Sequence, residues 1–198
     1  ALPPVMVKPS MVCELPALES LEINPLIVDA AGCVALEARV LIDPVRGEGQ
    51  GRYTHLAIHP YPAHLCQEWR MPGGSRVQMR PVRPEDAALE QAFVSAMSDE
   101  SRRFRFMDGT RELPPSQIVR LTQIDYDREM ALIAVVREGG GERQIGSVRY
   151  VQTPDGESVE FALAVADAWQ KCGLGRRLME AIIDCARDRL YRSVVGEV

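Results

Sequence analysis

The chain has two parts that differ in how hydrophobic and polar residues follow one another. In the first part, residues 18–29 and 34–43 have the composition of two strands. Between them, Ala-Ala-Gly at 30–32 is typical of a hairpin turn in which glycine supplies a positive φ. A β-hairpin alone is only marginally stable in water. We therefore expect residues 1–45 to be the end of a larger domain.

The segment that follows, residues 46–76, is expected to be a linker. Three glycines lie within residues 44–51, and prolines interrupt residues 53–71, which we expect to be irregular or partly extended. Pro-Gly-Gly at 72–74 is the clearest boundary. The second domain is then expected to occupy residues 77–198.

Regular patterns begin after this boundary. Residues 77–81 alternate as a strand, and Pro84 is suited to begin a helix that runs to about residue 97, with Leu89 and Phe93 on its buried face. A second helix is predicted over residues 116–124, where apolar residues recur at three-residue steps.

Three more strands, at residues 130–137, 144–152 and 159–166, are separated by turns and predict an antiparallel meander. A helix over residues 176–190 then leads to a final strand at 193–198. A strand–helix–strand connection places this last strand parallel to the third strand of the meander. The expected fold class is α/β (α+β), with a mixed, mostly antiparallel sheet flanked by helices.

The loop between the third strand and the last helix, Gln-Lys-Cys-Gly-Leu-Gly-Arg-Arg at 170–177, is suited to hold a phosphate group. Gly173 and Gly175 allow successive backbone N–H groups to point into one concavity at a helix N-terminus. Lys171, Arg176 and Arg177 place positive charge beside the positive end of the helix dipole, which costs about 0.3–1 kcal/mol per exposed charge. A bound polyphosphate would make the same charges favourable.

Composition narrows the classes of protein. A net charge of −5 over 198 residues argues against general nucleic-acid binding, and the apolar run at 130–136 is too short to cross a bilayer. Five cysteines without C-x-x-C spacing fit reduced thiols, so we expect a cytoplasmic protein. Three histidines at 55, 59 and 64 lie near Cys66, but prolines interrupt them, and we favour an ordinary segment and predict no metal site.

The motif Gln170-x-x-Gly173-x-Gly175, placed after the apolar strand at 160–165 and before an amphipathic helix, resembles the GNAT superfamily of N-acetyltransferases. The resemblance implies that acetyl-CoA is the co-substrate, that the loop amides hold its pyrophosphate and that the preceding strand pairs with its pantetheine arm. The implied cofactor-binding residues are Leu163, Val165, Gln170, Lys171, Cys172, Gly173, Leu174, Gly175 and Arg176.

Two further segments, 79–86 and 101–107, resemble the GNAT domain of bacterial Pat-type protein lysine acetyltransferases, which is fused to an acyl-CoA synthetase-like body. Residues 21–26 and 35–40 resemble the last hairpin of its ATP-grasp domain. Asn24 and Glu37 take the positions of Mg²⁺ ligands there, although the acid is more often Asp, so we assign no metal or ATP binding. GNAT domains continue past residue 198 with a helix and two strands, so the domain is expected to lack these and the general acid cannot be named; Tyr191 does not fill that role.

Acetyl transfer to lysine requires a base, and Glu160 is our candidate. It begins the strand that leads into the loop, and alternation puts Ala162 and Ala164 on its face, where small side chains leave room for substrate. Backbone N–H groups of Leu163 or Val165 could polarise the thioester carbonyl. Glu157 lies in a turn and Asp167 reads as a loop cap. We disfavour covalent catalysis by Cys172.

The expected function is therefore acetyl-CoA-dependent acetylation of lysine side chains of proteins, possible targets being acyl-CoA synthetases. The alternatives are a non-catalytic acyl-CoA-sensing module and a small-amine acetyltransferase; an ATP-dependent ligase is least favoured. Arg102, Arg103 and Arg105, interleaved with two phenylalanines, either face an acidic acceptor protein or form a solvated helix end. The sequence does not define the oligomeric state.

Overall fold

The computed structural model describes residues 15–30, 32–43, 59–106 and 112–196. The chain divides into two compact units, residues 1–60 and 61–198, which we describe separately. Residues 46–58 of the expected linker, including His55, lie outside the described residues, as do Cys13 and the turn residue Ala31.

The first unit contains the predicted hairpin, with each of its strands divided in two. Its strands are β1 (Leu18–Ile23), β2 (Leu26–Asp29), β3 (Gly32–Ala35) and β4 (Ala38–Ile42). β1 pairs with β4 and β2 with β3, both antiparallel, and the division on the first side falls at Asn24 and Pro25. Every residue of β3 and β4 is exposed, so this hairpin has very little core of its own.

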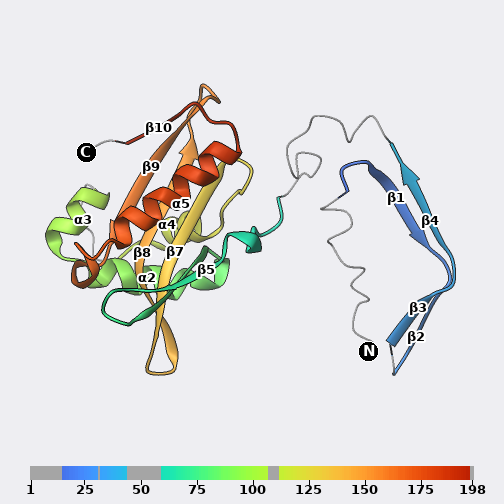
Figure 1. Ribbon diagram of the computed structural model, residues 1–198, viewed down its shortest axis with the longest axis horizontal. Coiled ribbons are helices and arrows are strands. Elements are labelled where there is room, and N and C mark those ends of the chain that lie inside the picture. The colour runs from blue at the N-terminus through green and yellow to red at the C-terminus, as the bar shows by residue number, and fades with distance from the viewer. Residues whose placement is uncertain (1–14, 31, 44–58, 107–111, 197–198) are drawn as a thin grey trace. The chain divides into compact units, whose positions relative to one another are not determined.

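The second unit is built on one six-stranded sheet. Its strands are β5 (Gln67–Arg70), β6 (Arg76–Pro81), β7 (Glu129–Glu138), β8 (Gly141–Gln152), β9 (Ser158–Val165) and β10 (Ser193–Val195), in the order β10-β9-β8-β7-β6-β5 (Figure 1). All neighbours are antiparallel except β9 and β10, which are parallel. The predicted meander and the predicted parallel last strand are both confirmed.

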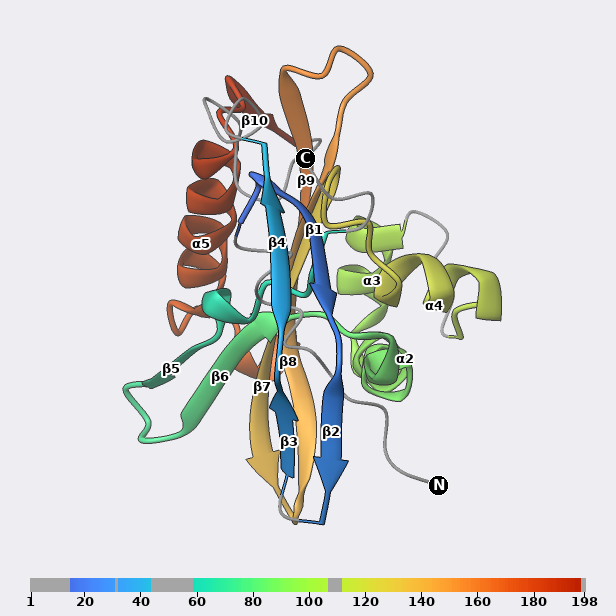
Figure 2. The same ribbon diagram turned by 90° about the vertical axis from the view of Figure 1, so that its right-hand side faces the viewer.

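Helices cover both faces of this sheet. They are α2 (Ala87–Ala96), α3 (Asp99–Phe106), α4 (Pro115–Thr122) and α5 (Leu174–Asp188), with single 3-10 turns η2 (Ala63–Leu65), η3 (Pro84–Asp86) and η4 (Asp167–Trp169). Figure 2 shows α5 on one face and α2, α3 and α4 on the other. Leu174, Leu178 and Ile182 of α5 are fully buried against the sheet, as the helical spacing of its apolar residues requires. No helix in the described ranges is long and apolar enough to span a membrane.

The expected linker differs from the structure at residues 61–76. Pro72, Gly73 and Gly74, expected as a domain boundary, form the turn of the β5–β6 hairpin, which the Met71 N–H closes by donating to the Ser75 carbonyl at 2.9 Å. β5 is the edge strand of the main sheet, and Trp69 packs against its core. A four-residue strand preceded by two prolines gives too weak a local pattern to be recognised, and it is fixed instead by pairing with β6.

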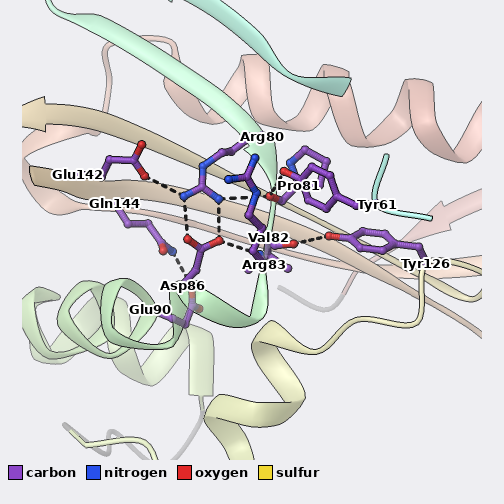
Figure 3. Close-up of polar contacts among 10 residues, drawn as sticks. All are labelled: Tyr61, Arg80, Pro81, Val82, Arg83, Asp86, Glu90, Tyr126, Glu142 and Gln144. Atoms are coloured by element: carbon purple, nitrogen blue, oxygen red, sulfur yellow. Dashed lines mark hydrogen bonds and ion pairs between the residues drawn. The ribbon is translucent and has the colours of Figure 1, made fainter. Parts of the chain in front are cut away.

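A buried polar cluster joins β6 to the start of the next helix (Figure 3). Arg80 donates two hydrogen bonds of 2.7 Å to Asp86, and both residues are only 4% exposed. Arg80 also donates to Glu142 at 2.9 Å, and Asp86 accepts from the Arg83 N–H at 2.7 Å. Mainly because of its hydrogen bonds with Asp86, the pKa of the Arg80 guanidinium is raised despite burial, so this guanidinium stays charged.

A second buried contact connects α2 to the sheet. Glu90 is 4% exposed and accepts a 2.6 Å hydrogen bond from Gln144 of β8, while Leu89, predicted to share the buried face with Phe93, is only half-buried. Gln144 precedes a bulge, because the β7–β8 ladder passes over Ile145. The helix is thereby anchored beside the irregular part of β8.

The Arg80–Asp86 pair gives a testable prediction for stability. Asp86→Ala should lower the free energy of unfolding by about 3–5 kcal/mol in urea denaturation, because it leaves a buried guanidinium without its main partner. Glu138→Ala is the matched control, since it removes a two-bonded partner of Arg143 where both side chains are about half exposed. Equal losses in the two variants would contradict a special role for the buried pair.

Candidate active site

The predicted phosphate loop has backbone N–H groups without partners. Gly173 caps α5 with φ of +90°, and Lys171 has φ of +59°, so two left-handed residues bend the loop immediately before the helix. The first backbone bond of the helix is donated by the Arg177 N–H to the Gly173 carbonyl at 3.2 Å. Among the described residues, none accepts a hydrogen bond from the amides between Lys171 and Arg176. This row of donors can bind an anion.

The side-chain cations of the loop have local partners. Arg176 forms an exposed ion pair with Glu180 at 2.8 Å, and the Arg177 guanidinium lies 5.1 Å from the centre of the Trp69 ring. Only Lys171 has no side-chain partner within the described ranges. Arg176 and Arg177 therefore do not require a bound anion to explain their positions, and the case for phosphate binding depends on the backbone.

The outer edge of β9 is open beyond its first three residues. Within the described residues, β10 pairs only with Ser158–Glu160. The Ala166 N–H donates to the Ile145 carbonyl in β8 at 2.9 Å, so strand alternation directs the N–H groups of Leu163 and Val165 away from β8. The structure thus places both predicted cofactor-binding residues on an edge with no strand partner in the described chain.

The two faces of β9 differ in what covers them. A Cβ atom at Gly175 would lie 3.6 Å from both Leu163 and Val165, so these side chains face α5 and lie beside the loop helix. Ala164 packs on the opposite side, against the cluster that includes Phe93 and Leu121. Leu174, another predicted cofactor-binding residue, is fully buried, so only its backbone is available to a ligand.

Glu160, the predicted base, lies where β9 and β10 separate. It is opposite Val195 in the last pair of that ladder, and its side chain is exposed. The described residues therefore do not supply the partial desolvation expected of a base at this position. Substrates entering between the strands would have to exclude water from its carboxylate.

Three polar residues near the loop are turned toward the protein. Gln170 donates through its side-chain nitrogen to the Val165 carbonyl at 3.3 Å and through its backbone N–H to the Asp167 carbonyl at 3.3 Å, so its backbone N–H is not free for a ligand. The Cys172 thiol donates to the Trp169 carbonyl at 2.8 Å. Asp167 accepts hydrogen bonds from Ser98 and Ser101, as expected of a loop cap.

The arginine-rich segment is helix α3, and its arginines differ from one another. Arg102 is 2% exposed and donates to the Met97 carbonyl and to Asp99, so it cannot contact an acceptor protein; the remaining buried nitrogen, Nε, has no partner among the described residues. Burial, followed by the nearby charge of Arg149, lowers the pKa of Arg105 to about 10. Arg103 is exposed. The side chains of Phe104 and Phe106 lie outside those described.

Sequence reasoning missed two contributors to this site, Trp69 beneath Arg177 and the serines at the start of α3. Ser98 and Ser101 lie more than 60 residues from Asp167 in sequence, so no local pattern joins them. The only signal was the Ser-Asp-Glu-Ser sequence at 98–101, which is typical of a helix N-terminus.

The sequence model described as the acetyltransferase (GNAT) family matches residues 93–197, more than half of the chain. The chain belongs to the GNAT acetyltransferase family. The expected α+β fold, with a mixed sheet flanked by helices, is thereby confirmed.

Two relatives of this GNAT chain are informative. Acetyltransferase PA5475 of Pseudomonas aeruginosa is 36% identical over 121 residues, which are 61% of this chain and 65% of that protein, just under two thirds of its length. The crystal structure of the GNAT domain of S. lividans PAT is similar with a TM-score of 0.63 and 31% identity, over 70% of this chain and 81% of that one. Acetyl-CoA is the acyl donor of the family, and the row of free amides fits its diphosphate.

Alanine substitutions at the two glycines of the loop should differ in their effect on stability. Gly173→Ala should destabilise the chain by about 1–2 kcal/mol, because an alanine in the left-handed region is strained even where space is available. Gly175→Ala should be neutral or stabilise by up to about 1 kcal/mol, because its Cβ would make ordinary contacts inside a helix. Urea denaturation of both variants tests this, and an equal loss in both would contradict it.

Proposed function

We propose that this GNAT chain transfers the acetyl group of acetyl-CoA to lysine side-chain amines of proteins, by direct attack in a ternary complex. The observation that carries the proposal is the presence of unpaired backbone donors on both sides of the turn that joins β9 to α5. One group lies on the open edge of β9 at Leu163 and Val165, the other lies in the loop and first turn of α5, and Glu160 lies where β9 and β10 separate. The described cysteines are all unpaired, which suits a reducing, cytoplasmic setting.

The chemistry asked of the chain is mainly removal of a proton. A lysine with a pKa near 10.4 is mostly charged at pH 7, and freeing its lone pair costs about 4.6 kcal/mol. Glu160 would accept this proton directly or through water. The amine nitrogen then bonds to the thioester carbonyl carbon and the carbon–sulfur bond breaks. The nitrogen gives up a second proton as it becomes an amide, and the departing CoA thiolate takes up one proton, so the protons balance.

The outward backbone N–H groups would hold the electrophile. A donor aimed at the developing oxyanion is worth about 2.7–4 kcal/mol in enzymes where one has been deleted. Leu163 and Val165 direct such groups to the open edge, and the small residues Ala162 and Ala164 alternate with them on the other face of β9. Donor and acceptor substrates would thus approach the separation of β9 and β10 from different faces.

Lysines of proteins are favoured as acceptors by the similarity to the GNAT domain of S. lividans PAT. The Pat-type resemblance also makes acyl-CoA synthetases plausible targets. In the hairpin unit, the Asn24 N–H donates to the Glu37 carbonyl at 3.1 Å, so the two residues compared with ATP-grasp metal ligands lie opposite each other. This supports an ATP-grasp origin for the hairpin without assigning it a ligand.

The exposure of Glu160 favours a second candidate, a non-catalytic module that binds acyl-CoA and reports it to a partner. A small-amine acetyltransferase is the third. Calorimetry with acetyl-CoA, together with a CoA-release assay on lysine-containing proteins and on polyamines, separates the three. Binding without CoA release from either acceptor would favour the sensor.

Glu160→Gln is the direct test of the enzyme. It should lower kcat by two or more orders of magnitude while the Kd for acetyl-CoA stays within about twofold, because the amide keeps the shape and loses the base. Glu157→Gln is the control, since Glu157 is a nearby carboxylate that pairs with Arg192 at 2.8 Å. An unchanged kcat in Glu160→Gln, or an equal loss in both variants, would remove Glu160 from the mechanism.

A further inference from the structure

One carboxylate ties the start of α3 to the end of β9. Asp167 Oδ2 accepts from the Ser98 N–H at 2.8 Å, and Oδ1 accepts from the Ser98 and Ser101 hydroxyls at 2.9 and 2.7 Å. Ser98 Oγ in turn accepts from the Ser101 N–H at 3.2 Å, as at a helix N-cap. These contacts bridge more than 60 residues of sequence, so they join separate elements of the fold.

The tie continues into the loop through Gln170. Its side-chain nitrogen lies 3.4 Å from Ser101 Oγ, 3.4 Å from Asp167 Oδ1 and 3.3 Å from the Val165 carbonyl. The same side chain therefore contacts α3, the turn η4 and the outer edge of β9. The loop amides that follow Gln170 have no such support of their own within the described residues.

Asp167 is charged when it makes these contacts. Hydrogen bonds from the Ser98 backbone, followed by the Ser101 hydroxyl, lower the pKa of its carboxyl group. Hydrogen bonds to a charged acceptor are roughly twice as strong as those between neutral groups. At its other side α3 is held by Arg102, which is buried and bonded to the Met97 carbonyl. Arg102 thus holds α3 in place, and α3 in turn supports the loop through its contacts with Asp167 and Gln170.

We propose that Asp167 is a positioning residue: through Ser98, Ser101 and Gln170 it preorganises the diphosphate-binding loop against α3. The inference rests on the proposed binding of acetyl-CoA by this loop. A ligand that meets a loop already ordered loses less conformational entropy on binding. Loss of the tie should therefore weaken cofactor binding and leave the chemical step at saturation nearly unchanged.

The test measures the Kd for acetyl-CoA by calorimetry and kcat by CoA release, with the full chain. Asp167→Ala should weaken acetyl-CoA binding about tenfold or more, and Ser101→Ala about threefold, while kcat at saturation changes by less than about threefold. Asp155→Ala is the matched control. Asp155 is also exposed and accepts three hydrogen bonds, from Thr153, Glu157 and Ser158, but in the turn at the opposite end of β9. It should leave Kd unchanged.

A double-mutant cycle separates positioning from a general loss of stability. Asp167→Ala combined with Ser101→Ala should bind acetyl-CoA no more weakly than Asp167→Ala alone, because both substitutions break the same contact. Additive losses, or a Kd equal to that of the unsubstituted chain in Asp167→Ala, would overturn the proposal. If the unsubstituted chain itself does not bind acetyl-CoA, the proposed function fails instead.

Discussion

The site depends on backbone donors of β9 and α5 that the described chain does not satisfy. An uncovered strand edge and a helix N-terminus both leave backbone N–H groups unpaired, and a row of such donors can bind another molecule. Here the row exists because β10 pairs with only three residues of β9 and because Gly173 and Lys171 bend the chain before α5. An extended ligand that carries amide acceptors and ends in a diphosphate matches both parts of the row, which is why the fold suits an acyl-CoA.

The rest of the second unit holds this open edge in place from both faces of the sheet. On one face, α5 packs closely because Gly146 lacks a side chain: a Cβ at Gly146 would lie 2.9 Å from Leu178. On the other face, the Arg80–Asp86 pair fixes the start of α2, and Glu90 links that helix to Gln144 beside the bulge of β8. The bulge residue Ile145 accepts from Ala166 at the end of β9. A chain of buried polar contacts therefore leads from β6 to the entrance of the loop.

Local patterns were sufficient for the elements whose cause is local. The meander, the parallel last strand and the glycine loop follow from alternation, turn residues and the spacing of Gly173 and Gly175. The features that the sequence did not predict depend on distant partners: β5 pairs with β6, and Asp167 beside the loop accepts from Ser98 and Ser101 at the start of α3. Burial of Glu90 could not be predicted for the same reason: an acidic residue on a helix is expected to face solvent, and only the structure shows that Gln144 lies beside it. The outward direction of the Leu163 and Val165 N–H groups could not be predicted either, because it depends on the register in which β9 pairs with β8.

The positive side chains around the loop are less direct evidence for anion binding once their partners in the structure are known. From the sequence alone, the positive charges of Lys171, Arg176 and Arg177 beside a helix N-terminus indicated a bound anion. In the structure, Glu180 neutralises Arg176, and Trp69 offers Arg177 a ring face, an interaction worth about 0.5–1 kcal/mol at an exposed site, comparable to the dipole cost it opposes. Anion binding therefore depends more on the orientation of the amides than on these two side chains. Affinity for a polyphosphate is therefore expected to depend mainly on the backbone conformation at Gly173 and on the contacts that fix the turn before it.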